Sequence, residues 1–404
     1  MPKPTASGQS RSNALIVLIA VVALATSSCA SKRPTETATG TAASVAGEVP
    51  RTTVEANQTA PGQTQPTASD TTSDTAPSPT GAVVVADGLN QPTQFVIGPG
   101  RTLIIAQLNG DEDAKQGQVV LVDLGTKKSS RRRVLLDGLD KPTGVAWVNG
   151  ELWVMVKRGL IRSAWDGSET DPSSPENVLA GLPFNGRSEG TLTPLPDGRL
   201  LYETSGNLIG QTIDTGRVEP GSGELHLLDA KSLRSTVVAK GTKHPYSRVV
   251  TSENQLLVTE IGDGPGSPPP DELNLIDLKQ ATADGAVDLG WPRCPTDREP
   301  DKPGCETIPS PLAAFPANST PTGVATSGSF AYVALFSLGL IVRIDYTGWS
   351  RGAANRPWLV AASDLDGPYS LLADGGRVLV SEHNTGRILA FVEKSLETNK
   401  GSVS

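Results

Sequence analysis

Short apolar runs, separated by glycine, proline, aspartate and asparagine, recur along the chain from Val83 onward. Runs of this length between turn-forming residues are typical of β-strands. Helical spacing is nearly absent, and only residues 393–400 offer a short helix. The pattern predicts an all-β domain, and the 42 glycines and 32 prolines agree with a chain that turns often.

These strands repeat in units of roughly 50 residues with about four strands each. Each unit opens with a short turn that contains proline, and an apolar stretch, a glycine-containing turn and further strands follow. The six openings lie at residues 88–93, 138–143, 181–183, 243–245, 319–322 and 366–368. One such unit cannot bury its faces alone, whereas six units in a ring can.

The repeat therefore predicts a six-bladed β-propeller over residues 83–394, followed by a C-terminal tail over residues 395–404. We expect the ring to close by pairing of residues 83–85 with residues 387–391, because closure protects an open sheet edge. Two smaller β-domains are the alternative architecture, and the even spacing of the repeat argues against them.

Residues 1–28 have the pattern of an export signal. Basic residues precede a 12-residue apolar run at residues 14–25, and small residues lead to Cys29. Such a run is too short for a membrane-spanning helix, which needs about 20 residues. The segment resembles a bacterial lipoprotein signal, although Thr26 stands where that pattern prefers leucine. The resemblance implies that Cys29 is lipidated, and ordinary cleavage beside an incidental cysteine is the alternative.

Residues 29–82 form a segment of threonine, serine, alanine, proline, glycine and glutamine with almost no large apolar side chain. Such a composition cannot bury enough surface to offset the entropy of ordering, so we expect a disordered tether. Lipidated Cys29 and this tether would hold a monomeric propeller at the extracytoplasmic face of the cell membrane.

The formal net charge of −8 argues against a nucleic-acid partner, which requires a basic surface. Apart from Cys29, the only cysteines are Cys294 and Cys305, which are 11 positions apart. In an exported protein this pair predicts a disulfide. In the chain-entropy view it would stabilise the fold by roughly 2–3 kcal/mol.

Residues 271–276 (DELNLI) form an apolar strand that begins with two carboxylates, Asp271 and Glu272. Two acids at the mouth of a strand can bind a cation or cap a turn, and residue chemistry alone favours the turn. This motif, with residues 290–294 (GWPRC) and the upstream run LLVTE at residues 256–260, resembles the glucose/sorbosone dehydrogenase family over about 50 residues. The resemblance implies a six-bladed propeller that oxidises aldoses with pyrroloquinoline quinone (PQQ) and calcium.

The same resemblance assigns candidate roles, and the catalytic part of the pattern is altered. The family's base is a histidine in a segment H-x-G-G-x-L, and the matching residues 187–192 read RSEGTL, with PDGRLLY after them. The base position is thus Arg187, which cannot accept a proton. The family's Arg-Asn-Pro clamp corresponds to residues 243–245 (KHP), and its calcium-binding Gly-Pro pair corresponds to Gly262 and Asp263.

Loops that enter the innermost strands of a propeller surround its central channel. Here they carry a polar and partly cationic ring: Thr93, Gln94, Thr143, Arg187, Ser188, Glu189, His244, Tyr246, Ser247, Arg248, Thr322, Tyr369 and Ser370. An anionic tricarboxylate such as PQQ needs cations, so the candidate cofactor-binding residues are Arg187, Lys243, His244 and Arg248. The candidate calcium ligands are Gly262, Asp263, Asp271 and Glu272.

Histidine can accept a proton near neutral pH, which makes His244 the candidate base. His226 lies in an apolar strand and is expected to be structural, whereas His383 follows a strand and has either a turn role or a functional one. Polar residues are also common in loops without any function, which leaves the ring open to a simpler explanation.

Three functional hypotheses follow. The first is an exported, membrane-anchored sugar dehydrogenase-like propeller that oxidises aldoses with PQQ and calcium. The second, motivated by the altered base position, is a non-catalytic propeller that binds a glycan or a protein partner at the cell surface. The third is a lactonase-type hydrolase with a divalent ion held by Glu260, Asp263 or Asp271.

Overall fold

A computed structural model describes residues 79–111, 113–124, 132–186, 189–209, 217–262, 269–294, 303–350 and 353–398, with the side chains of residues 397 and 398 left out. These residues belong to a single compact unit, residues 71–404. The predicted export signal, Cys29 and most of the predicted tether lie outside the described residues. Within the described parts of the chain, no helix is long and apolar enough to cross a membrane.

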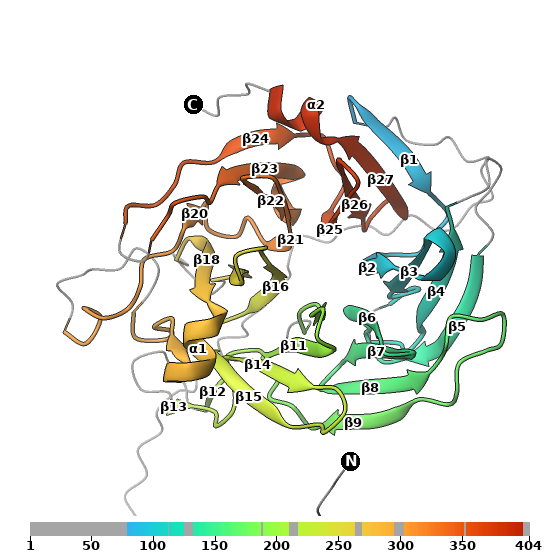
Figure 1. The fold of residues 1–404 in the computed structure, drawn as a ribbon, viewed down its shortest axis with the longest axis horizontal. Helices are drawn as coiled ribbons and strands as arrows, with labels where there is room; N and C mark the ends of the chain where they lie inside the picture. The colour runs from blue at the N-terminus through green and yellow to red at the C-terminus, as the bar shows by residue number, and fades with distance from the viewer. Residues whose placement is uncertain are drawn as a thin grey trace, which may run out of the picture. The chain divides into compact units, whose positions relative to one another are not determined.

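Six sheets are arranged around a centre as the blades of a β-propeller (Figure 1). The innermost strands, which follow the openings of the repeat, are β2 (Pro92–Ile97), β6 (Gly144–Val148), β10 (Thr193–Pro194), β16 (Pro245–Val250), β21 (Pro321–Ser327) and β25 (Pro368–Asp374). The second strands are β3 (Thr102–Gln107), β7 (Glu151–Val156), β11 (Arg199–Thr204), β17 (Gln255–Glu260), β22 (Phe330–Leu335) and β26 (Arg377–Glu382). The predicted six-bladed propeller is confirmed, and the alternative of two β-domains is wrong.

Two more strands complete each blade. The third strands are β4 (Gly117–Asp123), β8 (Gly159–Ala164), β14 (Glu224–Asp229), β18 (Asp271–Asp277), β23 (Leu340–Asp345) and β27 (Arg387–Val392). The outermost strands are β5 (Arg132–Leu139), β9 (Glu176–Ala180), β15 (Ser235–Lys240), β20 (Ala313–Phe315), β24 (Leu359–Ala362) and, in the last blade, β1 (Ala82–Ala86).

Short elements decorate this frame. They are β12 (Leu208–Ile209), β13 (Arg217–Val218), β19 (Val287–Asp288), the 3-10 helices η1 (Pro99–Arg101) and η2 (Phe336–Leu338), and the α-helices α1 (Leu278–Asp284) and α2 (Glu393–Thr398). The helix α2 lies within residues 393–400, where the sequence predicted a short helix. The side chain of Asp277 caps α1 by accepting a hydrogen bond from the main-chain nitrogen of Gln280.

The first strand of the domain closes the ring. β1 pairs antiparallel with β27, and Val83 lies opposite Ala390 while Val84 lies opposite Leu389. Figure 1 shows the blue first strand beside the red last blade. This pairing confirms the predicted closure, and it covers the edge of β27 that an open propeller would expose.

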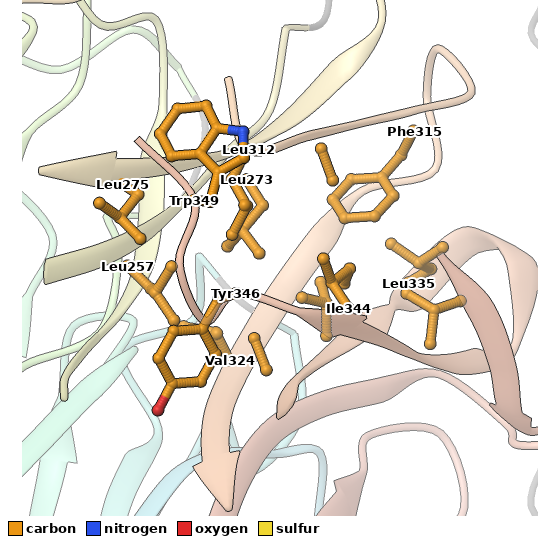
Figure 2. Packing of buried hydrophobic residues seen from close by; sticks show 14 residues of the cluster. Leu257, Leu273, Leu275, Leu312, Phe315, Val324, Leu335, Ile344, Tyr346 and Trp349 are labelled. Atoms are coloured by element: carbon orange, nitrogen blue, oxygen red, sulfur yellow. The ribbon is translucent and has the colours of Figure 1, made fainter. Parts of the chain in front are cut away.

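The hydrophobic core lies between neighbouring blades. In the cluster of Figure 2, Leu257 and Leu273 of the fourth blade pack with Leu335 and Ile344 of the fifth, and Trp349 belongs to the same cluster. The second strand of each blade is buried on both faces because a blade is packed between two others. This explains why the strands read as nearly continuous apolar runs rather than as alternating ones.

Hydroxyl side chains join the innermost strands across every blade junction. The hydroxyls of Thr93, Thr143, Thr191, Thr322 and Ser381 donate to main-chain oxygens of the next blade, at 3.0, 3.3, 3.3, 3.1 and 2.9 Å, and Ser247 accepts from the nitrogen of Val324 at 3.2 Å. Glycine allows the close approach: a Cβ on Gly190 would lie 2.4 Å from the Tyr246 oxygen. Thus many polar residues of the predicted ring hold the blades together.

Candidate functional site

Two tyrosines meet on the face where the innermost strands begin. Tyr246 and Tyr369 directly follow the first prolines of β16 and β25. Their hydroxyl groups are hydrogen-bonded to each other, and their ring centroids lie 5.7 Å apart. Both side chains are buried. The two tyrosines come from the fourth and sixth blades, so their contact reaches past the fifth blade.

Three further rings extend this pair into an aromatic platform, which consists of His244, Tyr246, Phe336, Tyr369 and His383. The His244 ring meets the Tyr246 ring edge-on at 5.1 Å, and the His383 ring stacks on Tyr369 at 5.1 Å. Phe336 lies 5.9 Å from each of Tyr369 and His383. Phe336 and His383 are half-buried and form the accessible part of the platform.

The sequence placed His244, Tyr246 and Tyr369 on this face, left the role of His383 open and missed Phe336. A signal was present, because Phe336 and His383 each directly follow the second strand of their blade. The equivalent position in the fourth blade is Ile261, whose side chain packs beside Tyr246. Alignment of the repeats at the ends of these strands would have brought the two aromatic residues together.

The environment of His383 selects its tautomer. Its Nδ1 lies 3.2 Å from the carbonyl oxygen of Pro92. Because a carbonyl oxygen can only accept, Nδ1 carries the hydrogen, and in the neutral ring Nε2 bears the lone pair. In this tautomer Nε2 is the ring nitrogen that can accept a hydrogen bond. By contrast, the candidate base His244 is only 3% exposed and lies against Tyr246.

The predicted cations make contacts within the protein. Arg248 is buried, and its guanidinium donates to the main-chain oxygens of Pro245, at 2.8 Å, and of Thr191. Burial lowers the pKa of Arg248 to about 10, so the group stays charged at neutral pH. The Lys243 ammonium lies 5.5 Å from the centre of the Trp291 ring. Arg187 lies outside the described residues. The described residues that meet on this face are the aromatic rings of the platform rather than cations.

The candidate calcium ligands have structural partners. Asp271 accepts hydrogen bonds from the nitrogens of Gly262 and Thr320, both at 2.8 Å, and from the Ser319 hydroxyl at 3.0 Å. It therefore ties the fourth blade to the segment that enters the fifth. Glu272 accepts from the amide of Asn274, which also donates to Glu260. Asp263 lies outside the described residues, and the described ones contain no cluster of histidine, cysteine or acidic side chains that could hold a metal.

Two buried carboxyl groups stand near the tyrosines, and sequence reasoning singled out only Glu189. Glu189 accepts from the nitrogen of Arg158, and its Oε2 is buried without a hydrogen-bond partner. Glu203, in the apolar strand β11, accepts from the nitrogen of Gly190 at 2.6 Å. Burial raises the pKa of each carboxyl group to about 7. The acid within the apolar run LLYET was the signal for Glu203.

The remaining predicted residues lie away from the platform. Cys294 and Cys305 form a disulfide. His226 lies in β14 and stacks on Tyr202 at 4.7 Å, as expected of a structural residue. Burial lowers the pKa of His226 to about 4.

Solved structures of sugar dehydrogenases share this fold. The PQQ-bound aldose sugar dehydrogenase from Streptomyces coelicolor is 19% identical, with a TM-score of 0.60, over 78% of this chain and 99% of that chain. The PQQ domain of a pyranose dehydrogenase from Coprinopsis cinerea is 14% identical, with a TM-score of 0.59, over 76% of this chain and 94% of that one. The apo form of the soluble aldose sugar dehydrogenase from Escherichia coli is 14% identical, with a TM-score of 0.54, over 76% and 98%. The chain therefore has a sugar dehydrogenase-like propeller fold.

No protein-family model matches the chain, and no curated protein matches it.

Proposed function

We propose that this propeller binds a carbohydrate on the aromatic platform. The observation that carries the proposal is the cluster of five rings at the centre of one face, of which Phe336 and His383 are half-buried. Aromatic faces offer a large apolar area with a defined geometry, and this suits the C–H faces of a sugar ring. Binding pockets combine such apolar surface with a few polar groups, which His383 supplies here. The sugar dehydrogenase-like fold supports the same class of ligand.

The described residues do not fit PQQ and calcium. A tricarboxylate on the platform needs cations there, and none of the five platform side chains is a lysine or an arginine. Calcium needs six to eight oxygen ligands, and both carboxylate oxygens of Asp271 already accept hydrogen bonds from the protein. No oxidation step through PQQ is therefore derived for this chain.

Oxidation of an aldose remains the second candidate function, and one observation favours it. His383 has the tautomer that can take a proton from a sugar hydroxyl at Nε2, and it lies at the accessible rim of the platform. His383 would then be the base in place of His244. It would compensate for the arginine that stands at the family's base position.

Replacement of Phe336 by alanine should weaken carbohydrate binding about threefold to tenfold, because a well-placed aromatic contact contributes roughly 0.5–1.5 kcal/mol. The measurement is calorimetric titration of the full-length chain carrying Cys29→Ser, with glucose and with a glucose oligosaccharide. Phe330→Ala is the matched control. Phe330 is also half-buried and opens the same strand, β22, at its opposite end, so its loss should leave binding unchanged.

Absence of sugar binding by the unsubstituted chain would refute the proposal that the platform binds carbohydrate. Equal losses of affinity in the Phe336→Ala and Phe330→Ala variants would also refute it. The same preparation is then titrated with PQQ and calcium and assayed for aldose oxidation. Micromolar binding together with turnover that His383→Ala abolishes would establish the second candidate. Turnover that His383→Ala leaves intact would eliminate His383 as its base.

We further propose that lipidated Cys29 anchors the propeller at the extracytoplasmic face of the cell membrane. The support is the signal-like segment of residues 1–28 and the polar tether that follows it. Cys29→Ser should move the protein from the membrane fraction to the soluble extracytoplasmic fraction, and radiolabelled fatty acid should no longer enter the chain. Fatty-acid labelling that survives this substitution would show that Cys29 is not the anchor.

A further inference from the structure

A cavity of about 390 Å³, which we call the funnel, is lined by the later residues of the innermost strands, whereas the aromatic platform lies where these strands begin. All six blades line it through their innermost strands or the residues just before them. Its rim carries Ile97 and Pro194, which are exposed, and its walls carry the half-buried Trp147, Val249 and Ala373. None of the five platform residues lines this cavity, so the funnel is a separate site.

Two buried polar side chains, Gln94 and Arg248, line the funnel. Gln94 is buried there, and its amide nitrogen donates to the Leu192 oxygen at 2.6 Å. Its amide oxygen accepts from the nitrogens of Val145 and Leu192, both at 2.8 Å. The Gln94 side chain thereby links the first three blades and closes part of the floor.

The second polar group in the lining of the funnel is the guanidinium of Arg248. Arg248 is 4% exposed and lines the cavity. Two of its nitrogens donate to main-chain oxygens, whereas Nε is buried and has no hydrogen-bond partner. Buried polar groups nearly always have a partner, and a charged donor without one is costly. Arg248 thus brings to the lining of the funnel a charged group with one donor unused.

We propose that the funnel binds a small apolar molecule with a single carboxylate, whose oxygen accepts from the Arg248 guanidinium while its hydrocarbon body packs against the funnel walls. The volume falls within the range of small-molecule pockets, about 300–1,000 Å³. Trp147, Val249 and Ile97 offer apolar contact along the walls and rim. A charge-assisted hydrogen bond to the guanidinium selects an anion over a neutral or cationic head group.

Octanoate is the probe, with octan-1-ol and octylammonium as neutral and cationic counterparts of equal chain length. Calorimetric titration of the full-length chain carrying Cys29→Ser should show octanoate binding at least about tenfold more tightly than either counterpart. Ala373→Trp should fill the funnel and reduce octanoate binding at least tenfold. Ala180→Trp is the matched control, because Ala180 is exposed at the end of β9 and outside the funnel.

Arg248→Met should abolish the preference for octanoate over octan-1-ol while the apolar walls remain. If this variant fails to fold, the comparison of Ala373→Trp with Ala180→Trp still tests the proposal, because Ala373 is half-buried in the wall of the funnel. Absence of octanoate binding at millimolar concentration overturns the proposal. Equal affinities for octanoate and octan-1-ol would also overturn it. Octanoate binding that Ala373→Trp leaves unchanged would do the same.

Discussion

Glu203→Gln is expected to stabilise the protein by about 3 kcal/mol at pH 8 and to leave it almost unchanged at pH 4.5. Burial raises the pKa of Glu203 from 4.5 to about 7. A shift of this size corresponds to roughly 1.4 kcal/mol per pKa unit. Glutamine keeps an oxygen that can accept from the Gly190 nitrogen but cannot ionise, so it avoids the cost of a buried charge.

The sign follows from proton linkage. Between pH 4.5 and about 7 the folded state binds the Glu203 proton more tightly than the unfolded state does, so the contribution of this group to stability decreases as pH rises. Glu189 titrates in the same range and interacts with Glu203, so the two protons belong to the pair. His226 acts in the opposite direction, because its folded-state pKa is lowered to about 4 and its contribution increases as pH rises from 4 to 6.5.

The difference between variant and unsubstituted chain isolates Glu203 from these other groups. Urea unfolding of both, at pH values from 4.5 to 8, should give a stability difference that grows with pH. Glu253→Gln is the control, since Glu253 is exposed and its loss should change stability by less than about 0.5 kcal/mol at any pH. A constant difference across this range, or a Glu203→Gln variant less stable at pH 8, would contradict the prediction.

Deletion of residues 79–86 is expected to cost at least about 4 kcal/mol of folding free energy. The deletion removes β1, in which four residues pair with β27, and each lost hydrogen bond costs roughly 1 kcal/mol. It also uncovers apolar surface around Ala86, which is 3% exposed. The free edge of β27 should then pair with a second copy, so that dimers or larger species form.

Urea unfolding and gel filtration of the full-length chain measure both effects. Val84→Thr serves as the control, because Val84 is 37% exposed and the substitution keeps its main-chain pairing with Leu389. This control should change stability by less than about 0.5 kcal/mol and remain monomeric. A deletion variant that stays monomeric with unchanged stability would mean that β1 does not close the ring.

The architecture could be read from local patterns. The proline-containing openings recur six times along the chain, and each one proved to lead into an innermost strand. The closure of residues 83–85 onto residues 387–391 followed from the same repeat, because a ring of blades must protect its last edge. The disulfide could be predicted because Cys294 and Cys305 are near each other in sequence.

The site could be read only in part. The rule that residues after each proline face the channel located Tyr246, Tyr369 and Glu189. It could not distinguish a residue that binds a ligand from a buried residue that only packs within the protein. Arg248 is the example. Its charge suggested binding of the anionic cofactor PQQ in the central channel, whereas its guanidinium donates to the oxygens of Pro245 and Thr191 and lines the funnel.

Local spacing and turn chemistry along the chain specified the repeat, the strands and the ring, because a strand and its turn depend on residues close in sequence. Only the closed ring brought Phe336 of the fifth blade beside His383 of the sixth, and Tyr246 beside Tyr369 across 123 positions. Burial likewise depends on all the blades together, and it raises the pKa of Glu203. The tautomer of His383 depends on the carbonyl oxygen of Pro92 in the first blade. The chemistry of a propeller centre depends on contacts between blades, and such contacts exist only once the blades have assembled.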